Sequence, residues 1–291
     1  MNRFREKINN NEFVVTTEIG PPKGVDLAPI LEDLKIVKGK VDAVNVTDQQ
    51  SAVMRLGSVA ASKALIDNGY EPICQFTCRD RNRIALQSDL LSAYSLGIEN
   101  ILIMTGDHPI LGDHPQAKPV YDLDSVNLLN AVNSLHSGKD LAGKVLSGSP
   151  DFLVGAVVNP GADPLEPEIL KMEKKINLGA RFFQTQAIFD IDIFCDFLEA
   201  IKGIRKNIKI LGGIVPLKSA KMARYMNANI PGVTIPEKII DIMDNAKDVD
   251  KESIAISADI FNAIKGLCEG VHFMPVKANY LVAGILDKVA I

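Results

Sequence analysis

The chain has no tryptophan, few other aromatic residues, and only four cysteines and four histidines among its 291 residues. Four cysteines are too few for a disulfide scaffold of this size, and Cys74 and Cys78 have no second pair at the spacing of a zinc site. We therefore expect free thiols in a reducing compartment. The histidines are not clustered at two-to-four-residue spacing either, so the sequence predicts no metal centre.

Long apolar runs and an excess of positive charge are also absent. The polar N-terminus lacks the apolar core of a signal peptide, and no segment approaches the roughly 18 to 20 apolar residues that span a bilayer. The 32 basic and 36 acidic residues give a net charge of −4, without a dense basic run. Such a balance argues against nucleic-acid and anionic-membrane partners. We expect a soluble, cytoplasmic protein.

What is present is a regular alternation of short apolar runs and segments with helical periodicity. The runs read as strands at 13–17, 41–46, 71–76, 100–104, 152–158, 180–184, 208–214 and 270–274. The helices are expected at 27–38, 56–68, 81–96, 125–137, 167–178, 192–204, 219–226 and 251–267. Two long segments, 106–124 and 227–247, read as irregular loops.

This alternation predicts an α/β protein with parallel strands and crossover helices. Eight units of about 30 to 35 residues are typical of a (β/α)8 TIM barrel. An open doubly wound sheet would carry a glycine-rich turn after its first strand, whereas this strand runs into Glu18-Ile19-Gly20-Pro21-Pro22. We therefore predict a single-domain barrel over residues 1–291.

The active site of such a barrel lies at the C-terminal ends of its strands. Carboxylate, amide and hydroxyl side chains predominate there. They occur at Glu18 and in the segments 47–50, 77–80, 105–108, 159–160 and 184–186, followed by 216–218 and 275–277. The one lysine inside an expected strand, Lys209, lies at the opposite end, which argues against a Schiff-base aldolase. The groups that remain suit acid catalysis by a carboxylate and binding of a planar heteroaromatic ligand.

The same strand ends carry a family resemblance, in order and over essentially the whole chain. The segments are Thr17-Glu18-Ile19-Gly20-Pro21-Pro22, Val46-Thr47, Phe76-Thr77-Cys78-Arg79-Asp80, Thr105-Gly106-Asp107-His108-Pro109, Asn159-Pro160, Phe183-Gln184-Thr185-Gln186 with Phe189-Asp190, and Gly270-Val271-His272-Phe273. Together they resemble the methylenetetrahydrofolate reductase family, whose catalytic domain is a flavin-dependent barrel. The resemblance implies reduction of 5,10-methylenetetrahydrofolate to 5-methyltetrahydrofolate.

The resemblance also implies roles for individual residues. Glu18 corresponds to the general acid that protonates N10 of the folate and opens its ring to a 5-iminium cation, to which N5 of the reduced flavin delivers hydride. Asp107 corresponds to the aspartate that stabilises this cation, as a catalytic and substrate-binding residue. Gln186 corresponds to the glutamine that binds the pterin, and Gln184, two residues earlier, is a second candidate.

The implied cofactor is FAD, with FMN as the alternative. Its expected contacts are Thr47, Asp80, Thr105, Gly106, Asp107, Asn159 and Lys175, with His108 and His114 as further candidates in the long loop. An aromatic residue that packs on folate and nicotinamide in the family is replaced here by Ala220. The electron donor is therefore left open between NAD(P)H and a partner electron-transfer protein. The chain is expected to form a homo-oligomer or a complex subunit.

Two other functions keep the same fold. One is a barrel that binds folate or flavin without turnover and serves as a scaffold in a multiprotein complex. The other is a flavin-free, folate-dependent methyltransferase barrel. The scaffold would bind flavin or folate without forming a methyl product. The methyltransferase would show no flavin absorbance even after reconstitution.

Overall fold

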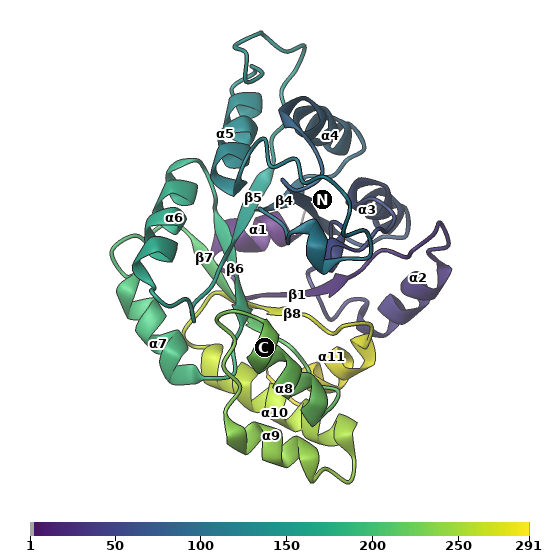
Figure 1. The fold of residues 1–291 in the computed structure, drawn as a ribbon, viewed down its shortest axis with the longest axis vertical. Coiled ribbons are helices and arrows are strands. Elements are labelled where there is room, and N and C mark those ends of the chain that lie inside the picture. The colour runs from purple at the N-terminus through teal and green to yellow at the C-terminus, as the bar shows by residue number, and fades with distance from the viewer. Residues whose placement is uncertain (1–2, 291) are drawn as a thin grey trace.

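A computed structural model describes residues 3–290 and contains one closed barrel of eight parallel strands in sequence order (Figure 1). The strands are β1 (Val14–Ile19), β2 (Ala43–Val46), β3 (Pro72–Thr77), β4 (Asn100–Met104), β5 (Leu153–Val158), β6 (Phe182–Ala187), β7 (Lys209–Ile214) and β8 (Gly270–Phe273). Pairing of β1 with β8 closes the ring. The predicted α/β barrel is confirmed.

The strands are buried on both faces, which explains their continuous apolar character. Every residue of β2, β3 and β8 is buried. One face of each strand points into the barrel, and the other is covered by the surrounding helices (Figure 1). The helices predicted from the sequence are α2 (Ala28–Leu34), α3 (Ser58–Asp67), α4 (Arg83–Ser95), α5 (Ser125–His136), α6 (Glu166–Asn177), α7 (Ile191–Ala200), α8 (Ala220–Asn229) and α10 (Val249–Ile264).

Three helices were not predicted from the sequence: α1 (Arg3–Asn10), α9 (Glu237–Asp244) and α11 (Asn279–Leu286). Three short 3₁₀ turns, η1 (Lys35–Val37), η2 (Gln50–Ala52) and η3 (Pro109–Leu111), lie in connecting segments. The expectation of an irregular segment at 227–247 was wrong, because α9 occupies its middle. Ile240 and Met243, one turn apart, give α9 a buried face.

Helix α1 closes the N-terminal end of the barrel. Phe4 and Ile8, one turn apart, are buried against side chains from the first three residues of seven strands. These are Val14, Ala43, Ile73, Leu102, Leu153, Phe182 and Leu211. The rings of Phe4 and Phe182 meet edge to face at 5.3 Å between centroids. We call this apolar cluster, together with Phe4 and Ile8, the barrel floor.

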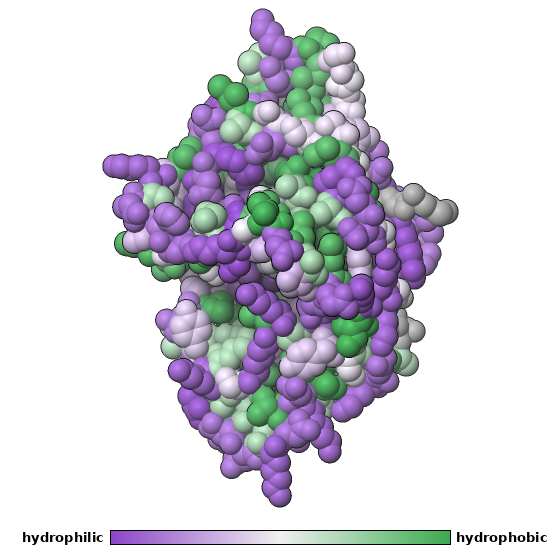
Figure 2. Space-filling model, turned by 90° about the vertical axis from the view of Figure 1, so that its right-hand side faces the viewer, coloured by the Kyte–Doolittle hydropathy of each residue, from purple (hydrophilic) through white to green (hydrophobic). Residues whose placement is uncertain are grey.

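Polar and apolar side chains are intermixed on the face of the molecule shown in Figure 2, with hydrophilic side chains along its outer edges. Within residues 3–290, no helix has both the length and the hydropathy needed to cross a bilayer.

Candidate active site

A layer of polar side chains lies directly above the barrel floor. Four of its members follow a floor position by two residues on the same strand, and His272 follows Gly270 in the same way on β8, so all five point into the barrel. The members are Thr16, Asn45, Gln75, Gln184 and His272, all buried. Branched apolar residues fill this position in most barrels. The polar layer therefore forms the base of a binding pocket.

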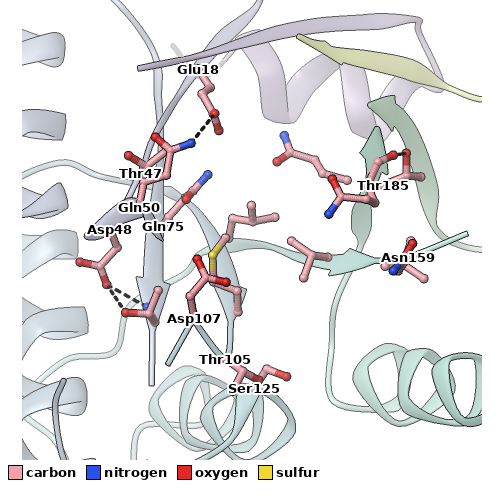
Figure 3. Close-up of a pocket in the computed structure, with 18 of the residues that line it drawn as sticks. Glu18, Thr47, Asp48, Gln50, Gln75, Thr105, Asp107, Ser125, Asn159 and Thr185 are labelled. Carbon is pink, nitrogen blue, oxygen red and sulfur yellow. Dashed lines mark hydrogen bonds between the residues drawn. The ribbon is translucent and has the colours of Figure 1, made fainter. Parts of the chain in front are cut away.

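The pocket has a volume of about 420 Å³ and opens at the C-terminal ends of the strands. The structure brings most of the predicted residues to it: Glu18, Thr47, Thr105, Gly106, Asp107, Asn159, Lys175, Gln184 and Gln186 (Figure 3). Glu18 and Gln186 lie inside β1 and β6 rather than beyond them, because both strands extend past their predicted ends. No phenylalanine or tyrosine from the described part of the chain lines this pocket.

Glu18 lies at the edge of the pocket, with its side chain 11% exposed. Its Oε1 accepts a hydrogen bond of 3.4 Å from Nε2 of Gln50, which belongs to η2 (Figure 3). Its Oε2 lies 3.7 Å from Nε2 of His272. One oxygen therefore faces a residue of the pocket wall, and the other faces the barrel interior.

Asp107 projects from the wall opposite Glu18 and is positioned by its backbone (Figure 3). Gly106 has a φ of +89°, and a Cβ at this position would lie 2.9 Å from Cβ of Thr77, so only glycine fits. The hydroxyl of Tyr121 donates to the Gly106 carbonyl at 3.1 Å, and Nη1 of Arg79 donates to the Asp107 carbonyl at 3.4 Å. These contacts direct the Asp107 carboxylate into the pocket.

Two polar groups of the pocket wall have unused hydrogen-bonding capacity. Thr47 Oγ1 is buried and has no hydrogen-bond partner among the described residues. Nζ of Lys175 donates one hydrogen bond, of 2.7 Å, to the Val157 carbonyl. Burial lowers the pKa of Lys175 to about 8, although the nearby Glu168 acts in the opposite direction. Both groups suit a ligand with acceptor atoms or negative charge.

The amide of Asn159 is occupied by the protein itself. Its Nδ2 donates to the Pro231 carbonyl at 3.1 Å, and its Oδ1 accepts from the Gly161 backbone at 3.2 Å. Asn159 therefore ties the end of β5 to the loop after α8. A cofactor contact of Asn159 would have to use the groups that this pairing leaves free.

Asp80 does not line the pocket that holds most of the other cofactor candidates. It pairs with the buried guanidinium of Arg79 at 2.7 Å and lines a neighbouring cavity together with His114. Arg79 lines both cavities. His108 lines neither of them, and its Nδ1 accepts from the Ile110 backbone at 3.2 Å. The structure therefore does not bring Asp80, His108 or His114 to Glu18.

Sequence reasoning missed polar residues inside the strands that line the pocket or lie directly behind it, among them Gln75, Asn45 and His272. The signal was present, since each is a polar residue inside an otherwise apolar strand. Reading it required knowing which face of the strand points inward. Gln75 points into the pocket from β3 (Figure 3).

Comparison with known sequences identifies the family. The sequence model of methylenetetrahydrofolate reductase matches residues 3–290. The chain belongs to the methylenetetrahydrofolate reductase family. This member is 25% identical over 245 residues to methylenetetrahydrofolate reductase 2 of Schizosaccharomyces pombe, with 79% of this chain and 38% of that protein aligned. With the 5,10-methylenetetrahydrofolate reductase of Escherichia coli it shares 24% identity over 253 residues, with 84% and 78% aligned.

This family member thus spans less than two fifths of the yeast protein and about three quarters of the bacterial one. Among solved structures, a Clostridium thermocellum protein that binds two copies of 5-methyl-5,6,7,8-tetrahydrofolic acid superposes with a TM-score of 0.66. Its sequence is 20% identical, and the alignment covers 97% of this chain and 96% of that one. The likeness supports the barrel fold over the full described length.

Proposed function

We propose that the protein is an oxidoreductase that reduces 5,10-methylenetetrahydrofolate to 5-methyltetrahydrofolate, with a bound flavin and with Glu18 as general acid. The observation that carries the proposal is the placement of two carboxylates, Glu18 and Asp107, on facing walls of one pocket rich in amides. The methylenetetrahydrofolate reductase family match over residues 3–290 supports the reaction. The binding of 5-methyltetrahydrofolic acid by the Clostridium thermocellum barrel supports the ligand class.

The residues of the pocket fit a flavin. The unpartnered hydroxyl of Thr47 would bind a ring edge, and the buried ammonium of Lys175 would bind a phosphate. We propose FAD, with FMN as the alternative, together with contacts from Thr105 and Gly106. When bound and reduced, a flavin supplies the hydride. Asp80 and Asn159 are proposed only as outlying contacts, since Arg79 and the loop after α8 engage their side chains.

In this proposal, Glu18 transfers a proton to N10 of the folate and so opens its ring to the 5-iminium cation. The Asp107 carboxylate stabilises the positive charge that develops on the substrate. The amides of Gln184 and Gln186 bind the pterin, which presents donors and acceptors side by side. Oε1 of Gln186 already accepts from the Ala187 backbone at 3.0 Å, so its amide N–H groups are the ones free for a ligand.

The decisive experiment follows flavin reoxidation without oxygen. Reconstituted, chemically reduced protein is mixed with 5,10-methylenetetrahydrofolate and compared with Glu18→Gln. We expect fast reoxidation in the wild type and a loss of about 10²-fold or more in the variant. Glu12→Gln, an exposed carboxylate far from the pocket, is the matched control and should behave as wild type. Flavin binding without reoxidation in the wild type would refute the reductase and favour the scaffold function.

The electron donor is proposed to be a partner electron-transfer protein, with NAD(P)H as the alternative. Among residues 3–290, the pocket wall has no phenylalanine or tyrosine on which a nicotinamide ring would stack, and Ala220 is a small buried residue. Anaerobic mixing with NADH and with NADPH tests this. Rapid bleaching of the flavin at physiological nucleotide concentration would refute the proposal that a partner protein is the electron donor. We also propose that the protein is cytoplasmic and works as a homo-oligomer or complex subunit.

One observation favours a second candidate, a flavin-free folate-dependent methyltransferase. The Clostridium thermocellum barrel, of nearly the same length, binds two folate molecules. If this chain does the same, it should show no flavin absorbance after reconstitution and should bind two equivalents of 5-methyltetrahydrofolate. Stoichiometric flavin retention would exclude this candidate.

A further inference from the structure

A line of buried polar groups extends behind Glu18 into the barrel interior. Nε2 of Gln184 donates to Oγ1 of Thr16 at 3.5 Å, at the outer limit of a hydrogen bond. Thr16 Oγ1 lies 2.9 Å from Nδ1 of His272, and Nε2 of His272 lies 3.7 Å from Oε2 of Glu18. The line thus connects a proposed pterin residue on β6 with the proposed acid on β1, through a histidine that is 3% exposed.

The surroundings of the His272 ring determine which nitrogen carries its proton. Nδ1 lies 2.9 Å from the hydroxyl of Thr16, which can donate to it, and 3.3 Å from the amide nitrogen of Asn45. The other acceptor within reach of the Thr16 hydroxyl, the Val271 carbonyl, is farther away at 3.4 Å. An Nδ1 that accepts leaves the ring proton on Nε2, which is the nitrogen facing Glu18.

We propose that neutral His272, protonated on Nε2, is a positioning residue for Glu18. Its Nε2 lies 3.7 Å from Oε2, beyond hydrogen-bond distance, and acts by electrostatic attraction on the negative charge that Glu18 acquires when it gives up its proton. From the pocket side, Nε2 of Gln50 donates to Oε1. The inference rests on the proposed function, in which Glu18 is the acid.

A neutral donor suits this place better than a cation. A positive charge fixed behind Glu18 would favour its ionised carboxylate before the folate binds and so leave no proton to transfer. The arrangement therefore provides orientation without adding a competing charge.

A double-mutant cycle on the reoxidation rate tests the proposal. His272→Leu removes the donor and should slow reoxidation about 10- to 100-fold, while flavin content stays unchanged. In the Glu18→Gln background the same substitution should change the rate by less than about twofold, because the group on which it acts is gone. Additive losses would overturn the proposal, since a purely structural role would also act without Glu18.

Two further variants guard against a folding defect in His272→Leu. His272→Gln restores a side-chain N–H and should recover most of the rate. His136→Leu is the matched control, because it removes another partly buried imidazole outside the pocket, one whose Nε2 accepts from the Phe152 backbone at 3.0 Å. It should leave reoxidation unchanged. A rate in His272→Gln as low as in His272→Leu would contradict the donor role.

A spectroscopic test needs no turnover. In protein labelled with ¹⁵N-histidine and free of flavin and folate, His272 should give the signals of a neutral ring with bare Nδ1 and protonated Nε2. Glu18→Gln should shift the Nε2 signal. A proton on Nδ1, or a doubly protonated ring at neutral pH, would overturn the hydrogen-bond assignment. If the wild type never reoxidises, the catalytic role falls with the proposed function, and the spectrum still decides the tautomer.

Discussion

Lys175 is a buried amine of the pocket wall, and a bound anion would change its protonation. Burial lowers its pKa to about 8, so the amine of the ligand-free protein begins to lose its proton just above neutrality. A phosphate placed beside Nζ would favour the ammonium form. Binding of a flavin phosphate should therefore take up a proton when the pH is above 8.

This linkage predicts that flavin affinity falls as the pH rises from 8 to 9 and above, with a slope approaching about tenfold per pH unit. Flavin fluorescence titrations at pH 7, 8 and 9 measure it. Lys175→Met should bind weakly at every pH and lose the slope. Equal slopes in the variant and the wild type would remove Lys175 from the phosphate site.

The four cysteines differ in environment. Burial raises the pKa of Cys74 and Cys78 to about 12 and that of Cys268 to about 11, whereas Cys195 is exposed on α7. We expect Cys195 alone to react with a thiol reagent in the native protein, and all four to react after denaturation. Cys195→Ser should abolish the native reaction. Rapid modification of a second thiol would show that a buried cysteine is accessible.

At the scale of the element, α1 depends on the barrel for its stability. An eight-residue helix is marginal by itself, and its two apolar side chains are buried against the strand residues of the barrel floor. Phe4→Ala should reduce the free energy of unfolding by about 3 to 5 kcal/mol in urea titrations. Asn9→Ala, on the exposed face of the same helix, should change it by less than about 0.5 kcal/mol. Similar effects of both substitutions would mean that α1 does not close the floor.

The backbone conformation of the segment after β4 depends on Gly106. Gly106→Ala places a Cβ against Thr77 in a backbone conformation that favours glycine, so the loop and the attached Asp107 must move. We expect a loss of stability of about 1 kcal/mol or more together with a slower folate half-reaction. Gly24→Ala, where a Cβ would have open space, is the control. Unchanged rates in Gly106→Ala would show that the position of Asp107 matters little.

The sequence predicted the helices and strands whose own residues show a clear hydrophobic pattern. The eight strands and their crossover helices alternate regularly enough to be counted, and the strand ends indicated where the pocket lies. Helix α1 escaped prediction because its signal is a single apolar pair, Phe4 and Ile8, in a polar segment. The role of such a pair depends on a floor assembled from seven distant positions, which the local pattern does not contain.

The pocket residues show the same division. Glu18, Asp107 and Gln186 could be named because they stand near strand ends and match the motifs of the methylenetetrahydrofolate reductase family. His272 and Gln75 lie within apolar strands, and their meaning depends on which face points inward. Asp80 looked equivalent to its neighbours in the sequence, but the buried Arg79 guanidinium next to it holds its carboxylate elsewhere.

At the scale of the whole molecule, the pocket is a cavity within the closed barrel, so a ligand bound there should stabilise the fold. If 5-methyltetrahydrofolate binds only the folded protein, a concentration of 100 times its dissociation constant adds about 2.7 kcal/mol to the free energy of unfolding. Calorimetry should then show a rise in Tm with ligand concentration. Gln186→Ala should reduce this rise at a fixed ligand concentration. A Tm that never moves would contradict folate binding at this site.

Because α1 closes the barrel floor, ligands cannot reach the pocket from that end of the barrel. The strands pair without a gap around the ring, and the far end is filled by the Phe4 cluster, so ligands enter and leave by one opening. The molecule that lies deepest must then arrive first and depart last. If the flavin of the proposed cycle lies deeper than the folate, its electron donor can reach it only after the folate has left. The depth of each binding position then sets the order of events.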